Sequence, residues 1–220
     1  MSGTPLYLTI IATLVVVTTI SAVGFTKLFK KYPKSYIWAN IPIMIYPYVY
    51  MIVLYIAGKA SNISSSMGMD INNAISNTTL EVSFIIAITY HPLIWGTLIA
   101  DFVSAIKGYL NPRSMAASSL IVKSVQIPAY IFHYLLGIVG VVTNVITGFA
   151  PLWIALFIDF VTISFTGAFT TANAIGLCRC KIISKPIAVL ASVLSFIFCI
   201  DVADVIGLYI LSRRKIKKLG

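Results

Sequence analysis

The sequence predicts an all-α, polytopic transmembrane helical bundle of about six spans. A helix needs about 20 predominantly apolar residues to cross a bilayer, and runs of this kind recur six times along the 220 residues. The composition agrees, since 59% of the residues are hydrophobic and only 10% are charged. Almost every charge falls between the apolar runs, which is typical of membrane helices joined by short connections. We therefore expect a single membrane domain over residues 1–220.

Each predicted span is an apolar segment bounded by charge, proline or glycine. The six segments are 6–25, 36–57, 82–106, 120–147, 151–176 and 187–211. No basic residue precedes the first segment, whereas a cleavable signal peptide begins with a positive region, so we expect this segment to be retained as a helix. A Ser/Asn-rich connection, 58–80, joins the second and third segments. A tight turn at 148–151 joins the fourth and fifth, which predicts that they are antiparallel neighbours.

The basic residues predict the orientation. Lysine and arginine occupy three connections on one side of the six-span scheme, 27–34, 107–123 (which includes Lys123) and 179–185. By the positive-inside rule this side faces the cytoplasm, and we expect a multi-pass protein of the plasma membrane. Five more cations follow the last span, and the six-span scheme places them on the opposite side. A re-entrant 187–211 segment turning near Asp201 would bring them back, but each of its arms is too short to cross.

Composition and motifs argue against several functions. The net charge of +10 does not indicate nucleic-acid binding, because the cations lie beside apolar segments, where anionic lipid headgroups attract them. Cys178-Arg179-Cys180 lacks the further Cys or His ligands of a structural zinc site. No nucleophile elbow, phosphate-binding loop or pair of metal-ligating histidines occurs. The sequence therefore predicts no cofactor and no metal site, and it disfavours an enzyme without excluding one.

The fifth predicted span carries a polar face. A charge inside the hydrocarbon is costly, so an intramembrane aspartate requires a reason. Here polar side chains recur every three or four residues, which at about 100° per residue places them on one narrow face. They are Asp159, Thr162, Thr166, Thr170 and Asn173. This face must point away from lipid, either as a polar pathway for a ligand or as a packing face whose hydroxyls bond a neighbouring helix.

The fourth predicted span has His133, Gly137 and Gly140 on one face. Small residues at this spacing let another helix approach closely, so the two glycines are candidates for contact with another membrane protein or a second copy. Because the fourth and fifth spans are expected to be neighbours, the His133 and Asp159 faces can meet. Counting from the turn, we expect a vertical offset of ~10 Å between these two residues, which a water or Thr166 would bridge.

Asp201 and Asp204 are three residues apart and share a face of the sixth predicted span. Two carboxylates can hold a hard cation, but a metal-dependent lipid phosphotransferase needs further acidic residues. The chain has only six acidic residues in all. Pairing with basic groups, or contact with a water-filled cavity, is the favoured interpretation.

Two segments in the second half carry a resemblance. Residues 121–130 read Ile-Val-Lys-Ser-Val-Gln-Ile-Pro-Ala-Tyr, and Ile183-Ser-Lys185 is followed by Phe196-Ile-Phe-Cys-Ile-Asp-Val202. From about Ile121 onward the chain resembles a group of small, functionally uncharacterised polytopic membrane proteins of Gram-positive bacteria. The resemblance implies a bacterial plasma membrane and supplies no activity.

The leading hypothesis is a small transporter, channel or permease-like subunit with a polar pathway on spans four and five. The candidate pathway or ligand-facing residues are His133, Asp159, Thr162, Thr166, Asn173, Asp201 and Asp204. The alternative is a non-catalytic accessory or immunity protein that binds a membrane partner through the face of Gly137 and Gly140. An intramembrane lipid-modifying enzyme that uses Asp201, Asp204 and the histidines is the third hypothesis. In every case the lipid bilayer is the expected surrounding.

Overall fold

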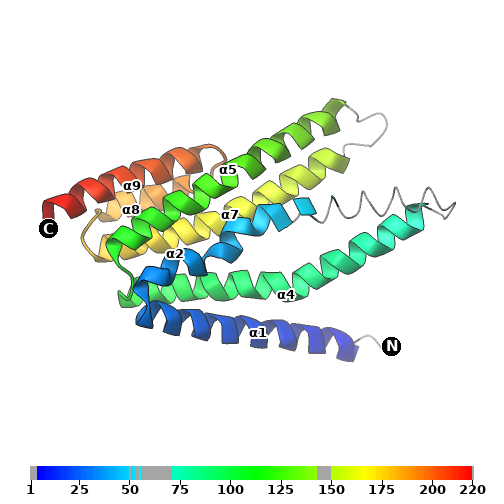
Figure 1. Ribbon diagram of the computed structural model, residues 1–220, viewed down its shortest axis with the longest axis horizontal. Helices are drawn as coiled ribbons and strands as arrows, with labels where there is room; N and C mark the ends of the chain where they lie inside the picture. Colours follow the sequence, from blue (N-terminus) through cyan, green and yellow to red (C-terminus); the bar gives the residue numbers. More distant parts are fainter. Residues whose placement is uncertain (1–3, 50, 53–54, 56–70, 143–149, 220) are drawn as a thin grey trace.

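Long apolar segments fold into long helices in the computed structural model, which describes residues 4–49, 51–52, 55, 71–142 and 150–219 (Figure 1). The long helices are α1 (Thr4–Lys31), α4 (Ile71–Lys107), α5 (Pro112–Val142) and α7 (Ala150–Arg179). The short elements η1 (Pro33–Ser35) and α2 (Tyr36–Ala39) follow α1, and residues 41–49 are again helical. Two shorter helices, α8 (Lys185–Leu194) and α9 (Ile200–Leu219), end the chain. The all-α prediction is confirmed for the described residues.

Among the described residues, three helices contain segments that are long and apolar enough to cross a membrane. These segments are Leu8–Lys31, Pro112–Val142 and Ala155–Arg179. The shortest has 24 residues, about 36 Å of helix against a hydrocarbon core of ~30 Å. They correspond to the first, fourth and fifth predicted spans and indicate a multi-pass membrane protein. The count of six spans stays a prediction.

The helices pack side by side around one core, with α5 antiparallel to α7, and with α4 parallel to both α7 and α1 (Figure 1). Figure 1 shows α5 beside α7, with α4 between α7 and α1, and contacts join each of these pairs. The core contains large aromatic side chains that are fully or almost fully buried, including Phe29, Tyr36 and Phe169. Two boundaries differ from the prediction: residues 71–80, expected in a connection, are helical in α4, and α5 begins at Pro112 rather than near 120. The predicted turn at 148–151 lies partly outside the described residues.

The predicted single helix over 187–211 is wrong, because this segment forms a hairpin of α8 and α9 with a turn at 195–199. The turn packs against the middle of α7, where the Ser195 hydroxyl donates to the Gly167 carbonyl at 3.2 Å. Gly167 is required there, since a Cβ atom would lie 2.7 Å from the Phe196 ring. Gly167 lies twelve residues before Arg179, the end of α7, or about 18 Å along the helix axis. The hairpin therefore enters the bundle partway and returns.

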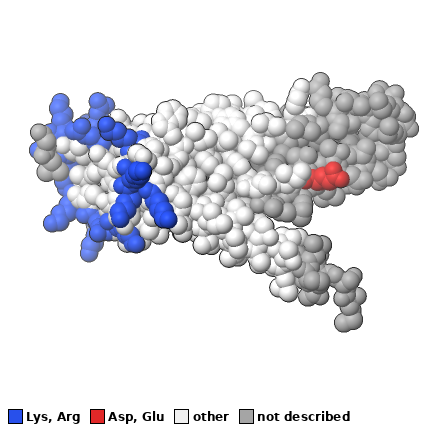
Figure 2. All heavy atoms as spheres, turned by 60° about the horizontal axis from the view of Figure 1, so that its bottom comes forward, with Lys and Arg blue, Asp and Glu red and all other residues white. Residues whose placement is uncertain are grey.

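The basic tail lies at the same end of the bundle as the basic connections. Arg214, Lys215 and Lys218 line a hollow together with Ile182 and Ile183 of the α7–α8 connection. Figure 1 places the C-terminus beside the α4–α5 and α7–α8 connections, and Figure 2 shows Lys and Arg gathered at one end. As the sequence predicts, each arm of the hairpin is too short to cross the membrane. Neither arm needs to cross it, because the hairpin enters the bundle partway and returns. Their inner end packs against α7 through Ser195, which is fully buried, whereas Phe196, Ile197 and Phe198 are 42–48% exposed.

Candidate functional site

The polar faces of α5 and α7 meet along the middle of the bundle. The polar side chains of α5 on this face recur at steps of three and four residues, and they are Lys123, Gln126, Tyr130 and His133. The facing residues of α7 are the predicted set, Asp159, Thr162, Thr166, Thr170 and Asn173. All of these side chains are buried except that of Asp159, which is 14% exposed. The predicted pairing of the two faces is confirmed.

His133 and Asp159 are in direct contact. His133 Nδ1 lies 2.6 Å from Asp159 Oδ1, and the His133 side chain is fully buried. The predicted vertical offset of about 10 Å is wrong, because it was counted from a turn at 148–151. His133 lies nine residues before the end of α5, and Asp159 lies nine residues after the start of α7, so the two are level. Neither a water nor Thr166 is needed between them.

A second ion pair joins α5 to the hairpin. Lys123 Nζ contacts Asp201 Oδ2 and also donates to the Thr166 hydroxyl at 2.5 Å, and the Lys123 and Asp201 side chains are each only 1% exposed. The sequence places Lys123 in a basic connection at the membrane surface, and this is wrong. The signal that would have found it is its spacing of three residues from Gln126 and ten from His133. A buried carboxylate and a buried ammonium require each other, since either alone would be strongly destabilising.

Asp204 belongs to the same group, as predicted from its position on the same helix face as Asp201. It lies within electrostatic range of both Lys123 and Asp201, and it is partly buried. The two carboxylates therefore share one cation. The contact of Asp201 with Lys123 matches the predicted pairing with a basic group. Among the described residues, no three His, Cys, Asp or Glu side chains are grouped so that they could hold a metal ion.

The remaining polar residues of α7 bond within the bundle. Thr162 and Thr166 donate to the carbonyls of Ile158 and Thr162, at 2.7 and 3.0 Å. Asn173 donates to the Ser119 hydroxyl at 2.8 Å and accepts a hydrogen bond of 2.6 Å from the Tyr36 hydroxyl. These bonds agree with the packing interpretation for this part of the face.

Asp101 was not among the predicted site residues. This α4 residue is fully buried, and it lies beside the side chains of Tyr36 and Asn40. Neither of its carboxylate oxygens makes a well-aligned hydrogen bond to a described residue. Thr97 and Ser104, four residues before and three after it, are also fully buried. This helical spacing of polar residues was the available signal, and it marks a buried polar face on α4.

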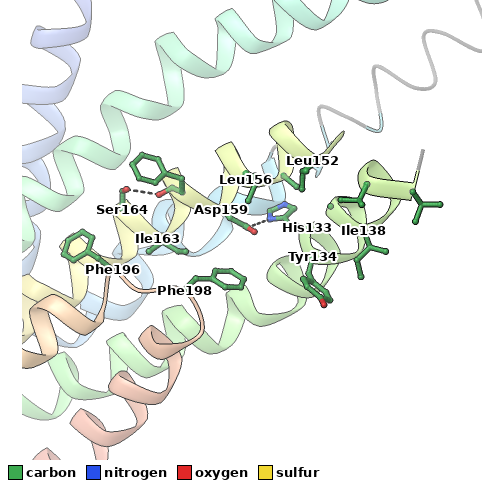
Figure 3. A pocket seen from close by; sticks show the side chains of 15 residues that line it. His133, Tyr134, Ile138, Leu152, Leu156, Asp159, Ile163, Ser164, Phe196 and Phe198 are labelled. Carbon is green, nitrogen blue, oxygen red and sulfur yellow. Dashed lines mark hydrogen bonds and ion pairs between the residues drawn. The ribbon is translucent and has the colours of Figure 1, made fainter. Parts of the chain in front are cut away.

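An apolar groove opens beside the His133–Asp159 pair. Its volume is about 690 Å³, and it lies between α5 and α7. Figure 3 shows Phe196 and Phe198, from the turn of the hairpin, beside this space, with His133 and Asp159 pointing toward each other. The groove is open at its rim, where Tyr134 is 64% and Phe160 71% exposed. The His133–Asp159 contact is thus a polar spot in a mostly apolar wall.

The two glycines of α5 pack against α7 of the same chain. A Cβ atom at Gly140 would lie 2.5 Å from the backbone nitrogen of Leu152, so this glycine is what allows α5 and α7 to approach. Gly137 faces the side chain of Leu152 and lines the groove. The predicted use of Gly140 for self-association or for a partner helix is therefore wrong, because α7 already covers it.

The site combines a histidine that can exchange a proton, a carboxylate in contact with it and an apolar space beside both. Comparisons of the chain with protein-family models, with curated proteins and with solved structures give no match.

Proposed function

We propose that the protein is a plasma-membrane transporter or transporter subunit that exchanges protons for an amphipathic cation taken from the lipid through the groove between α5 and α7. The observation that carries the proposal is the position of the His133–Asp159 pair in the wall of that groove. Ionisable groups inside apolar helices are rare, and they mark substrate paths and proton relays. The resemblance to membrane proteins of Gram-positive bacteria supports the location.

The chemistry follows from one carboxylate that serves two partners. When His133 carries a proton, its imidazolium and the Asp159 carboxylate neutralise each other across 2.6 Å. Loss of that proton leaves the carboxylate without a cation, and a positively charged ligand takes the place. The apolar wall, with Tyr134 and Phe160 at the rim, receives the rest of the ligand. Proton and ligand compete for Asp159, and such competition is the basis of exchange.

The hairpin would hold the inner part of the groove in position. Phe196 and Phe198 line it, and both belong to the turn between α8 and α9. The ion pair of Asp201 with Lys123 fixes the start of α9 to α5 close to that turn. We assign Lys123 and Asp201 as positioning residues, not as residues that contact the ligand.

The test is exchange by the purified protein in proteoliposomes, with ethidium as the amphipathic cation. A pH gradient should drive ethidium movement, and an internal pH-sensitive dye should report the opposite movement of protons. The Asp159→Asn variant keeps the shape of the side chain but loses its charge, so exchange should fall to the rate of protein-free liposomes. The matched control is Ser164→Ala, another polar residue that lines the groove, and it should retain exchange. A folded Asp159→Asn protein that exchanges at the wild-type rate would refute the proposal.

The second candidate is an accessory or immunity protein that binds a membrane partner. The exposed apolar side chains around the groove favour it, since Trp153 is 67% and Val142 75% exposed. A helix from another protein could cover this surface and leave Asp159 in its pair with His133. In that case the wild-type protein would bind its partner without moving ethidium or protons, and Asp159→Asn would change neither result.

A further inference from the structure

A basic hollow lies at the end of the bundle that carries the exposed Lys and Arg side chains (Figure 2). Its volume is about 400 Å³, and it lies between the first turns of α5 and the last turns of α9. Its lining includes Arg113, Ala116, Tyr209, Arg213, Ile216 and Lys217. Because α5 begins at Pro112 and is apolar and long enough to cross a membrane, the hollow lies at the level of the lipid headgroups.

Three cations converge on this hollow from two helices. Arg213 and Lys217 are four residues apart, so they share one face of α9, and Arg113 approaches from α5. The Arg213 guanidinium lies 6.0 Å from the centre of the Tyr209 ring, a contact that limits its orientation. The ion pairs of the described residues are the two in the bundle core. No described carboxylate therefore pairs with these cations, and their mutual repulsion favours an anion between them.

We propose that this hollow binds the phosphodiester headgroup of an anionic phospholipid. Guanidinium groups match phosphate oxygens in pairs, and basic pockets between membrane helices suit such headgroups. Lipid is favoured over free phosphate because Ala116 and Ile216 give the hollow an apolar side, and Tyr209 has the amphipathic character of an interfacial residue. The proposal requires that the chain lies in a membrane, but it does not depend on transport.

The opposite face of α9 provides a comparison with similar charge. Arg214, Lys215 and Lys218 line a second hollow of about 410 Å³, beside Ile182 and Ile183. The cations that line it all come from one helix, α9. The Arg214, Lys215 and Lys218 face should attract an anionic membrane surface in general, without binding one lipid headgroup in a defined position. Variants on the two faces can thus remove equal charge from different surroundings.

The test is the thermal stability of the full-length protein in detergent, titrated with short-chain phosphatidylglycerol. The lipid should raise the melting temperature of the wild type in a saturable way, and short-chain phosphatidylcholine should have little effect. The Arg213→Gln/Lys217→Gln variant should bind phosphatidylglycerol about tenfold more weakly. The control variant, Arg214→Gln/Lys218→Gln, should bind as the wild type does. Arg113→Lys keeps the charge but loses the paired hydrogen bonds, so it should be intermediate.

Three outcomes would overturn the proposal. Equal loss in the two double variants would indicate general attraction by the tail rather than a site. Equal stabilisation by phosphatidylcholine would indicate that the phosphatidylglycerol headgroup is not recognised. Stabilisation by inorganic phosphate alone, at the same concentration, would assign the hollow to free phosphate. None of these measurements involves ethidium or a pH gradient, so failure here is distinguishable from failure of the transport proposal.

Discussion

Two fully buried carboxylates, in different parts of the bundle, have different partners. Asp201 of α9 contacts the ammonium group of Lys123 on α5. Asp101 of α4 lies beside Tyr36 and Asn40, which are neutral. Both aspartates have 0% exposure, so burial alone does not distinguish them. The two aspartates differ in that Asp201 has a cation beside it.

This difference separates two ways of placing polar groups in an apolar bundle. An ionised carboxylate is tolerated there when a cation and hydrogen bonds surround it, as around Asp201. Without a cation, the protonated carboxyl is much less costly to bury, and it can act as a hydrogen-bond donor. The contact of α5 with α9 therefore includes a buried charge pair, whereas the Asp101 carboxyl of α4 lies beside neutral side chains. The charged contact joins residues 78 positions apart, so it fixes the hairpin to the rest of the fold.

Lys123→Met should have the largest effect on stability. It leaves Asp201 buried without its cation, and removal of one partner of a buried pair costs about 3–5 kcal/mol. The measurement is the free energy of unfolding in detergent. The double variant Lys123→Met/Asp201→Leu should recover most of the loss, because an apolar pair of similar volume is often as stable as the ion pair it replaces. A double variant that is as unstable as the sum of its single variants would show that the two residues are not coupled.

Gly140→Ala separates α5 from α7 without any change of charge, and it should have the next largest effect. The new Cβ atom would lie 2.5 Å from the Leu152 backbone nitrogen, which cannot move aside as a side chain could. Overpacking of this kind costs about 1–3 kcal/mol. The control is Gly207→Ala in α9, where a Cβ atom meets nothing within 4 Å. Alanine there should stabilise the helix by about 0.5–1 kcal/mol, so opposite signs are expected.

Asp101→Asn tests the comparison itself. If the carboxyl is protonated, the amide has nearly its shape and can still donate, so unfolding should change by less than about 1 kcal/mol. Asp201→Asn should cost about 3–5 kcal/mol, because it leaves Lys123 without its counter-charge. Unfolding of both variants in the same detergent checks this. An equally large loss for Asp101→Asn would mean that Asp101 is ionised in the folded protein.

The sequence predicted the regular part of the site. The spacing of the α7 polar residues and the short connection before α7 were enough to place their face against α5. It could not predict that His133 and Asp159 are level, because the ends of the two helices are not marked in an apolar sequence. It also could not separate α8 from α9. The turn at 195–199 contains neither glycine nor proline, and hydropathy is uninterrupted across it.

The missed residues share a physical cause. Lys123 and Asp101 are single charges near the ends of apolar segments, where charged side chains ordinarily reach the surface. Only the fold shows that Lys123 instead points to Asp201, which comes from a re-entrant helix. Tyr36, at the start of the second predicted span, is likewise fully buried and donates to Asn173. Position along a span therefore predicts environment poorly wherever a second element covers the helix end.

The smallest expected effect concerns Cys180, a partly buried thiol at the basic end. Burial raises the pKa of this thiol, and the neighbouring Arg179 guanidinium offsets part of the rise. Because the thiolate is the reactive form, labelling by N-ethylmaleimide in a Cys178→Ser/Cys199→Ser background should be slow at neutral pH and accelerate as the pH rises. Arg179→Gln should slow it by about two- to threefold, since an exposed charge interacts weakly. Faster labelling of this variant would mean that Arg179 acts by blocking access. A two- to threefold slower labelling of Arg179→Gln would show that a nearby charge also sets the reactivity of a half-buried group. The energy involved is far smaller than that of the Lys123–Asp201 pair in the core.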